Sequence, residues 1–314
     1  MKPFLLVNPR SAGGSTARHF DSISRAVQSA VGECAHAFTE APMHAAELTR
    51  RALGDGYDLV IVVGGDGTIN EVVNGFFAEP RPGEPARPLK PDAALGILPR
   101  GTGGDLRRTL GLDGDLGRCS LRLKGERRSV DVGRVDFQAE SGAPASRYFI
   151  NVAEVGVGAL VVDIANRSSK VLGGKLTFML ASVRALWGWR DLSVRASFDG
   201  GAAEELEVTT LAVANGRYFG GGMMVAPEAR IEDGLFHVTI WSGYKLADFA
   251  LKSGSMYDGS HLEHRGTKTR TARTVRLEPG VKAREPVMIE VDGEKIGSLP
   301  ATFSVLPGAL RIVC

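Results

Sequence analysis

The first 110 or so residues alternate short apolar runs with segments of helical periodicity, and this alternation restricts the fold more than any other feature. Four runs are typical of strands: PFLLVN, CAHAFTE, YDLVIVV and AALGILP. Each is followed by apolar residues at helical spacing or by a glycine loop that opens a helix. Strands and helices in alternation predict a parallel sheet with helices on both faces.

After about residue 124 the pattern changes to β-branched segments separated by glycine, proline or charged residues, interrupted by one helical stretch at about 172–188. Such segments predict an antiparallel β-sandwich. The expected fold class is therefore α/β plus β, with a parallel-sheet nucleotide-binding domain at 1–124 and a β-sandwich domain at 125–300. A ligand cleft is expected between the two domains.

Composition excludes several classes of protein. The chain has 314 residues, 43% hydrophobic and 24% charged, and its net charge of +2 is too small to indicate nucleic acid as the main partner. Three widely spaced cysteines favour a reducing compartment. The sequence shows no signal peptide at the start and no apolar window long enough to span a bilayer, so a cytoplasmic location is expected.

Three glycine-containing loops follow predicted strands, and all should meet at the carboxyl edge of the sheet, where ligands bind. They are NPRSAGG from Asn8, GGDGTINE from Gly64 and PRGTGGD from Pro99. Thr68 and Glu71 have capping-box spacing, and Asp105 alone would be interpreted as a helix N-cap. Asp66 has no such structural explanation, because a carboxylate in a tight turn beside N–H groups makes sense when it holds a cation or orients a phosphate.

The loops match neither of the common nucleotide motifs. They lack the lysine of a Walker A loop and do not read G-x-G-x-x-G, which disfavours P-loop NTPases and dinucleotide oxidoreductases. The remaining interpretation is a nucleotide phosphate bound by backbone amides, with Asp66 and Asp105 reaching Mg²⁺ directly or through water.

Five motifs in order, NPRSAGG, GGDGTINEVVNG, GILPRGTGGDL, VDVGRV and VDGE, resemble those of the diacylglycerol kinase catalytic-domain family, which includes bacterial lipid kinases and sphingosine kinases. The resemblance implies an NAD kinase/phosphofructokinase-like α/β domain facing the β-sandwich, with the segment at about 300–314 returning to the first domain. It also implies ATP as phosphoryl donor, Mg²⁺ as cofactor and a lipid hydroxyl, diacylglycerol-like or sphingoid, as acceptor.

The resemblance assigns roles to individual residues. Glu294 is expected to be the general base, with Asp66 at the catalytic centre and Asp292 a second candidate only if the strand at Gly293 is regular. Asp66, Asp105 and Asp131 would form an acidic network around the catalytic Mg²⁺. Arg230, Asp233 and Leu235 would hold a second, structural Mg²⁺. The expected ATP contacts are Asn8, Pro9, Arg10, Ser11, Thr39, Gly65, Asp66, Gly67, Thr68, Ile69, Asn70, Glu71, Gly101, Thr102 and Gly103.

One departure from the family pattern is Gly104, which stands where the family usually has asparagine. Two other functions remain open: a kinase of a soluble substrate such as NAD, and a non-catalytic nucleotide-binding protein. We expect peripheral contact with a membrane surface, at the inner face, and an exposed strand edge would allow two copies to pair. Neither the acceptor lipid nor the oligomeric state follows from the sequence.

Overall fold

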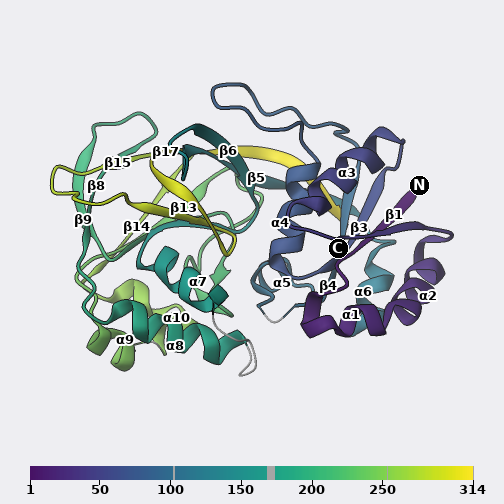
Figure 1. The fold of residues 1–314 in the computed structure, drawn as a ribbon, viewed down its shortest axis with the longest axis horizontal. Helices are drawn as coiled ribbons and strands as arrows, with labels where there is room; N and C mark the ends of the chain where they lie inside the picture. Colours follow the sequence, from purple (N-terminus) through teal and green to yellow (C-terminus); the bar gives the residue numbers. More distant parts are fainter. Residues whose placement is uncertain (102, 168–173, 253, 314) are drawn as a thin grey trace.

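The computed structural model describes residues 1–101, 103–167, 174–252 and 254–313, which form two lobes lying side by side (Figure 1). In the first lobe, the strands pair in parallel in the order β4-β3-β1-β2. β3 is buried along its whole length, which explains its unbroken apolar run. The strands are β1 (Pro3–Val7), β2 (Ala35–Phe38), β3 (Leu59–Gly64) and β4 (Ala94–Pro99).

Helices follow the strands of this sheet. They are η1 (Ser11–Gly14), α1 (Ser15–Arg18), α2 (Phe20–Val31), α3 (His44–Gly54), α4 (Asp66–Gly75), α5 (Asp105–Leu110) and α6 (Leu116–Arg122). In α2, Ile23, Val27 and Ala30 are buried, so one apolar face packs on the sheet.

The second lobe consists of antiparallel strands. They are β5 (Arg127–Ala139), β6 (Pro144–Phe149), β7 (Val152–Gly156), β8 (Leu192–Phe198), β9 (Glu204–Val208), β10 (Thr210–Ala214), β11 (Tyr218–Phe219), β12 (Met223–Met224), β13 (Phe236–Trp241), β14 (Thr267–Ala272), β15 (Thr274–Pro279), β16 (Met288–Val291) and β17 (Glu294–Val313). Parallel sheet and antiparallel sandwich together confirm the predicted fold class.

Two long strands connect the lobes. β5 and β17 pair antiparallel from Gly297 opposite Ala139 to Val313 opposite Arg127. The end of β17 pairs in parallel with β4, with Arg311 opposite Ala94, so the last strand completes the sheet of the first lobe (Figure 1). The two lobes therefore share one continuous hydrogen-bonded sheet.

The second lobe contains more helix than the sequence predicts. Beside α8 (Gly174–Leu186), which lies in the expected stretch, are α7 (Val157–Arg167), α9 (Leu246–Lys252), α10 (Ser255–Asp258) and η3 (Ser260–Glu263). The expectation of a single helical stretch is therefore wrong. α7, α8, α9 and α10 gather on one side of the strands (Figure 1).

A hydrophobic core crosses the junction of the lobes. Val130 and Val132 of β5 and Tyr148 of β6 belong to the same cluster of buried side chains as Val72 of α4 and Phe76, which follows that helix. The Phe77 and Tyr148 rings stack with centroids 4.3 Å apart. This packing holds the glycine loops of the first lobe against the strand ends of the second.

Candidate active site between the two lobes

The three predicted phosphate loops meet, as their positions after parallel strands require. A Cβ atom at Gly101 would lie 2.7 Å from Gly65 Cα, so the second and third loops touch through their backbones and only glycine fits there. Arg100 N–H donates to Gly64 O at 2.7 Å. In the first loop, the Asn8 side-chain amide donates to Thr68 Oγ1 at 2.8 Å. The convergence of the loops is thus confirmed.

Of the two helices that start at these loops, α4 has an open N-terminus. Helix α4 begins at Asp66 after Gly65, and no described side chain caps it. Helix α5 begins at Asp105 after Gly104, and its first N–H groups donate to the Asp66 carboxylate. The predicted capping box is wrong, because Thr68 accepts from Asn8 while Glu71 Oε2 accepts from Ala45 N–H of α3 at 3.1 Å. The first N–H groups of α4 are consequently available to an anion.

Asp66 and Asp105 form a close acidic pair. Asp66 Oδ2 accepts from Gly104 N–H at 2.8 Å and from Asp105 N–H at 3.3 Å, which ties the second loop to the third. Burial raises the pKa of the Asp105 carboxyl, and the charge of Asp66 adds to the increase. A side chain at Gly103 would lie 2.8 Å from Asp66 Oδ2, so this glycine leaves room for the carboxylate.

Asp105 also links the two lobes, so the interpretation of it as a simple N-cap is wrong. Its Oδ2 atom accepts from Gly221 N–H at 2.9 Å, and its Oδ1 atom lies 3.1 Å from Arg108. Sequence reasoning missed this contact, although the run of three glycines at 220–222 is a signal for a close backbone approach.

Glu294 begins β17 and reaches across to the first lobe. Its Oε2 atom accepts from Arg147 at 2.5 Å, and a side chain at Gly67 would lie 3.7 Å from its Oε1 atom. The Glu294 side chain keeps 39% of its surface exposed. The carboxylate therefore faces the first turn of α4 and is accessible from the space between the lobes. Arg147, which orients it, was not foreseen.

The predicted ATP contacts lie at this junction or just beside it. Asn8, Pro9, Arg10 and Ser11 form the turn after β1, where Asn8 Oδ1 accepts from Arg10 N–H and Asn8 O from Ser11 Oγ. Thr39 follows β2 and donates to Val7 O. The Ile69 side chain is in the core, and its N–H donates to Gly65 O at 3.0 Å. Thr102 lies outside the described residues.

Asp292 was predicted as a second candidate for the general base, but its carboxylate does not point where Glu294 points. Its oxygens accept four hydrogen bonds, from Asn70 Nδ2 and from the N–H groups of Ile150, Asn151 and Val152, at 2.7 to 3.0 Å. It adopts φ +47°, so the chain turns there and Glu294 points elsewhere. With its oxygens engaged, Asp292 is suited to fixing the turn before Glu294 and less to accepting a proton.

We expect Asp292→Ala to lower the free energy of unfolding by about 2–4 kcal/mol, because several N–H donors lose their acceptor. Urea unfolding measures the change. Asp199→Ala is the matched control: Asp199 also has positive φ and accepts from two N–H groups, but it is exposed. Equal losses for the two variants would contradict the role given to Asp292.

Asp131 of β5 has its own set of contacts. Its carboxyl accepts from Gly234 N–H at 2.6 Å and Gly308 N–H at 2.7 Å. Burial raises its pKa, and the neighbouring Asp233 and Glu232 carboxylates act in the same direction. These contacts of Asp131 involve the turn at Asp233 and the backbone at Gly308, and its part in one network with Asp66 and Asp105 stays a prediction.

The Asp233 turn was predicted to hold a structural Mg²⁺ with the carbonyls of Arg230 and Leu235. Asp233 Oδ1 accepts from Leu235 N–H at 3.0 Å, and Oδ2 lies 3.3 Å from His237 Nε2. The described residues contain no group of three His, Cys, Asp or Glu side chains arranged to hold a metal ion. A metal role for this turn stays a prediction.

The Asp66–Asp105 pair fits Mg²⁺ even though it supplies only two carboxylates. Mg²⁺ at nucleotide sites uses one or two protein carboxylates and completes its coordination with phosphate oxygens and water. Mutual repulsion, seen in the effect of Asp66 on the Asp105 pKa, would be relieved by a cation. The chemistry of this pair thus agrees with the expected cofactor.

Comparison with known proteins agrees with this geometry. Residues 2–135 match the model of the diacylglycerol kinase catalytic domain, and residues 151–314 match the YegS C-terminal NAD kinase beta sandwich-like domain. The chain is 28% identical over 312 residues to a diacylglycerol kinase of Bacillus subtilis (strain 168), covering 98% of this chain and 95% of that protein. It is 30% identical over 260 residues to one of Staphylococcus carnosus (strain TM300), covering 81% and 76%.

Solved structures show the same fold. A crystal structure of a diacylglycerol kinase from Bacillus anthracis str. Sterne has a TM-score of 0.70 at 21% identity, covering 99% of this chain and 96% of that chain. Yeast NADH kinase complexed with NADH has a TM-score of 0.52 at 12% identity, covering 99% and 82%. At these identities the likeness concerns the fold alone.

Proposed function

The chain belongs to the diacylglycerol kinase family, and from this premise we propose that it transfers the γ-phosphate of ATP to the hydroxyl of a lipid. The observation that carries the proposal is the position of Glu294, whose carboxylate from the second lobe faces Gly67 in the glycine-loop helix of the first. A base at this position would stand opposite the phosphate site, where an acceptor hydroxyl has to enter.

The first lobe is proposed to bind the nucleotide phosphates. The N–H groups at the start of α4 and the glycine loops around Gly65 and Gly101 supply donors and a positive dipole end. Asp66 and Asp105 would hold Mg²⁺, which when bound neutralises charge on the phosphate oxygens. The open N-terminus of α4 supports this assignment, because it leaves backbone donors for an anion.

The second lobe is proposed to supply the proton acceptor. Glu294 would take the proton of the lipid hydroxyl as its oxygen approaches the γ-phosphorus, and Arg147 would hold the carboxylate in place through their hydrogen bond. Asp292 and Asn70 would position the turn, since their 2.7 Å hydrogen bond connects it to α4.

Transfer of labelled γ-phosphate from ATP with Mg²⁺ to a panel of lipids in mixed micelles, with NAD alongside, tests the proposal. A labelled lipid is the expected product. Labelled NAD would instead make the protein a soluble-substrate kinase, for which only the fold shared with yeast NADH kinase argues. Bound ATP without any labelled product would contradict catalysis and direct attention to Gly104.

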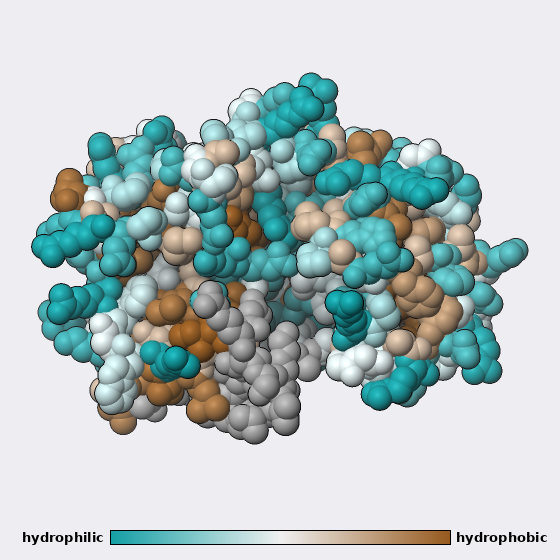
Figure 2. All heavy atoms as spheres, viewed as in Figure 1, coloured by the Kyte–Doolittle hydropathy of each residue, from teal (hydrophilic) through white to brown (hydrophobic). Residues whose placement is uncertain are grey.

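Contact with a membrane surface is part of the proposal. No described helix is long and apolar enough to cross a bilayer. The helical side of the second lobe nevertheless presents exposed apolar side chains, seen as brown surface over α8, α9 and α10 (Figure 2). Leu180, Val183 and Trp187 lie on one face of α8 and its end, and Leu251 of α9 is 85% exposed. Buried Ala181 and Ala185 attach the other face of α8 to the protein.

The stretch at 265–284 is rich in arginine and lysine, which could meet anionic headgroups, but it is a weak membrane candidate. Arg270 pairs with Glu204, Arg276 with Glu278 and Lys282 with Glu207. These side chains already have acidic partners, so less positive charge is available for anionic headgroups.

We expect Trp187→Ala to weaken binding to anionic phospholipid vesicles by about tenfold, because an exposed tryptophan contributes apolar area at the interface. Vesicle sedimentation measures the bound fraction. Val281→Ala, at an equally exposed position in the turn after β15, serves as control and should bind like the unmodified protein. Equal losses in both variants would argue against docking by the α8 face.

A further inference from the structure

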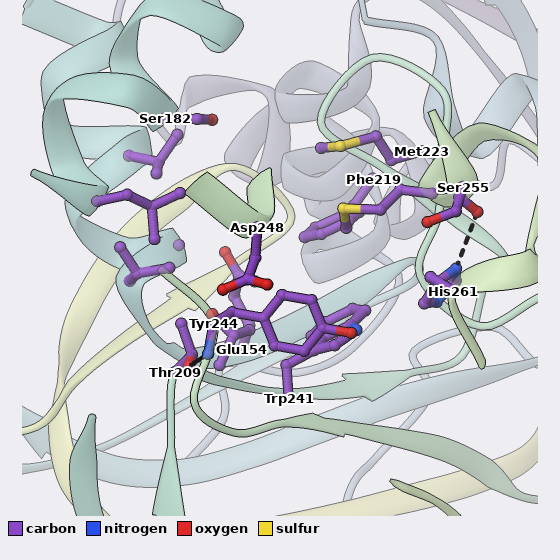
Figure 3. A pocket seen from close by; sticks show the side chains of 16 residues that line it. Glu154, Ser182, Thr209, Phe219, Met223, Trp241, Tyr244, Asp248, Ser255 and His261 are labelled. Atoms are coloured by element: carbon purple, nitrogen blue, oxygen red, sulfur yellow. Dashed lines mark hydrogen bonds between the residues drawn. The ribbon is translucent and has the colours of Figure 1, made fainter. Parts of the chain in front are cut away.

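Two buried carboxyl groups, Glu154 of β7 and Glu290 of β16, lie behind the turn that leads into Glu294. They occupy opposite positions in two antiparallel strands, and the residues are only 2% and 4% exposed. Figure 3 shows Glu154 beside Thr209 and Tyr244 at the wall of an apolar pocket. Neither carboxyl has a part in the transfer step described above, so the burial of both needs its own explanation.

The two side chains are joined by a hydrogen bond. An ionised carboxylate only accepts hydrogen bonds, so one of the two groups must keep a proton and donate it. Burial raises the pKa of Glu154 to about 7. Burial and the neighbouring Glu154 charge raise the pKa of Glu290 well above its ordinary value. At neutral pH, Glu290 is therefore the donor of this bond and Glu154 the acceptor.

Glu290 also contacts the turn before Glu294. Its Oε1 atom accepts from Gly293 N–H. The pairing of β16 with β17 shifts register between Ile289 and Glu290, and such an irregularity redirects a side chain from the regular strand pattern. One buried carboxyl thus connects the neighbouring strand β7 to the backbone next to the proposed base.

This turn depends on hydrogen bonds for its shape. Asp292 and Gly293 adopt φ +47° and +90°, and a Cβ atom at Gly293 would have no contact within 4 Å beyond its chain neighbours. Side-chain packing at Gly293 therefore does not fix the turn. The Asp292 carboxylate holds it on the side of α4, through Asn70 Nδ2 at 2.7 Å. Glu290 provides the contact on the side of β7.

The strands around the pair bring no cation onto it. Lys295 of β17 is opposite Glu290, but its Nζ atom lies 2.9 Å from Glu140 Oε1. The Asp292 charge raises the pKa of Glu290 further. On the other side of β7, β10 places the uncharged Ala212 opposite the first member of the pair.

The helices over the pair bring no cation either. Gly158 of α7 lies so close to Glu154 Oε1 that a side chain there would overlap it. The described lining of the pocket contains neither lysine nor arginine, and its other acid is Asp248 of α9. His261 has its pKa lowered, chiefly by burial. A retained proton therefore relieves the repulsion between the two carboxyls.

From these contacts, and resting on the kinase function proposed above, we propose that Glu290 is a positioning residue for phosphoryl transfer. Bonded to Glu154, it holds the Gly293 N–H and keeps Glu294 directed toward the glycine loops. This role needs the hydrogen bonds of the pair and does not need its negative charge.

Replacement of Glu290 separates hydrogen bonding from charge. Glu290→Leu removes both bonds, and kcat should fall by about 10- to 100-fold, the scale of a small misplacement of a catalytic group, with KM for ATP within about twofold of normal. Glu290→Gln can still donate to Glu154 and accept from Gly293 N–H, so it should keep at least about a third of kcat. Initial rates with labelled ATP and the best lipid acceptor in mixed micelles measure both.

Thr239→Val is the matched control. Thr239 of β13 is 1% exposed, and its hydroxyl donates to Val225 O at 2.7 Å. The substitution removes a buried hydrogen bond of the same lobe, so it should lower stability and leave kcat unchanged. A loss of kcat equal to that of Glu290→Leu would show that lost stability explains both variants and would overturn the positioning role.

Amide hydrogen exchange at Gly293, followed by NMR, is a readout that does not depend on turnover. We expect exchange to be faster by about tenfold or more in Glu290→Leu and unchanged in Glu290→Gln, because only the first removes the acceptor. If Glu290→Leu does not fold, Glu154→Leu replaces it. That variant removes the partner that holds Glu290, and it should lower kcat and speed exchange at Gly293 by smaller factors.

The retained proton makes the stability of the fold depend on pH. The pKa of Glu154 is raised from 4.5 to about 7, so the stability that this group contributes is fully present below pH 4.5 and is lost as the pH rises through about 7. The double variant Glu154→Gln/Glu290→Gln keeps the shape of the pair and cannot titrate. The unmodified protein should therefore lose stability relative to it between about pH 5 and 8, as urea unfolding measures. A difference that is constant with pH would overturn the shared proton.

The outcomes separate this inference from the proposed function. Normal kcat with unchanged Gly293 exchange in Glu290→Leu, or equal losses of kcat in the leucine and glutamine variants, would overturn the positioning role and leave the kinase intact. If the unmodified protein labels no lipid, the kinase proposal fails, and exchange at Gly293 decides alone. Faster exchange in Glu290→Leu then supports the role of Glu290 in holding the turn, and equal exchange overturns it.

Discussion

Replacing Glu294 by glutamine is expected to reduce phosphoryl transfer by about 10²–10⁴-fold, the usual contribution of a positioned general base. The glutamine keeps the shape and can still accept from Arg147, so the turn before β17 should stay in place. ATP affinity should change little, because the proposed phosphate donors belong to the first lobe. Initial rates at saturating lipid and ATP, with calorimetry for ATP binding, measure both quantities.

Glu140→Gln is the matched control for this experiment. Glu140 forms an ion pair with Lys295, the residue after Glu294, but it is exposed to solvent. Its replacement should leave turnover unchanged. A Glu294→Gln enzyme that retains more than a tenth of normal turnover would remove the base assignment, and a loss of ATP binding would instead indicate damage to the cleft.

Replacing Asp66 by asparagine should reduce turnover by about 10²-fold or more, since electrostatic groups at the transferred phosphate contribute on this scale. An asparagine oxygen can still accept from Gly104 N–H, so the contact between the second and third loops is preserved while the negative charge is lost. The dependence of the rate on Mg²⁺ concentration should shift to higher values, because the remaining carboxylate, Asp105, binds the cation more weakly alone.

Asp113→Asn provides the comparison for Asp66. Asp113 lies just beyond α5 and its side chain is 73% exposed, so its charge is screened by solvent. Normal turnover and an unchanged Mg²⁺ dependence are expected for this variant. An Asp66→Asn protein whose rate returns to normal at ordinary Mg²⁺ concentrations would show that the carboxylate is only a loop contact.

Local features of the sequence predicted the elements and the loops that meet. The pattern of a strand followed by glycines, around Gly65 and Gly101, was sufficient to predict that the loops meet. The carboxyl ends of parallel strands lie on one edge of the sheet whatever follows in the chain. The helices around α7, α9 and α10 were missed, since their short apolar segments do not distinguish a buried helix from a strand.

Contacts between residues that are far apart in the sequence did not follow from the motifs. The sequence grouped Asp131 with Asp66 and Asp105, and Asp292 with Glu294, because their motifs resemble those of one family. In the fold, β5 takes Asp131 to the turn at Asp233, and the positive φ of Asp292 sends its carboxylate to four donors near α4. One turn residue can redirect a side chain in a way that spacing alone does not reveal.

The sequence by itself thus determined the fold class, the three glycine loops and the identity of the acidic residues that serve them, because these depend on local periodicity and on backbone freedom at glycine. Only the tertiary structure decided that Arg147 holds Glu294, that Gly221 completes the Asp105 site and that Glu154 meets Glu290 inside an apolar pocket. These contacts join residues 116 to 147 positions apart in the sequence, and their geometry depends on strand register and lobe packing, which no short segment encodes.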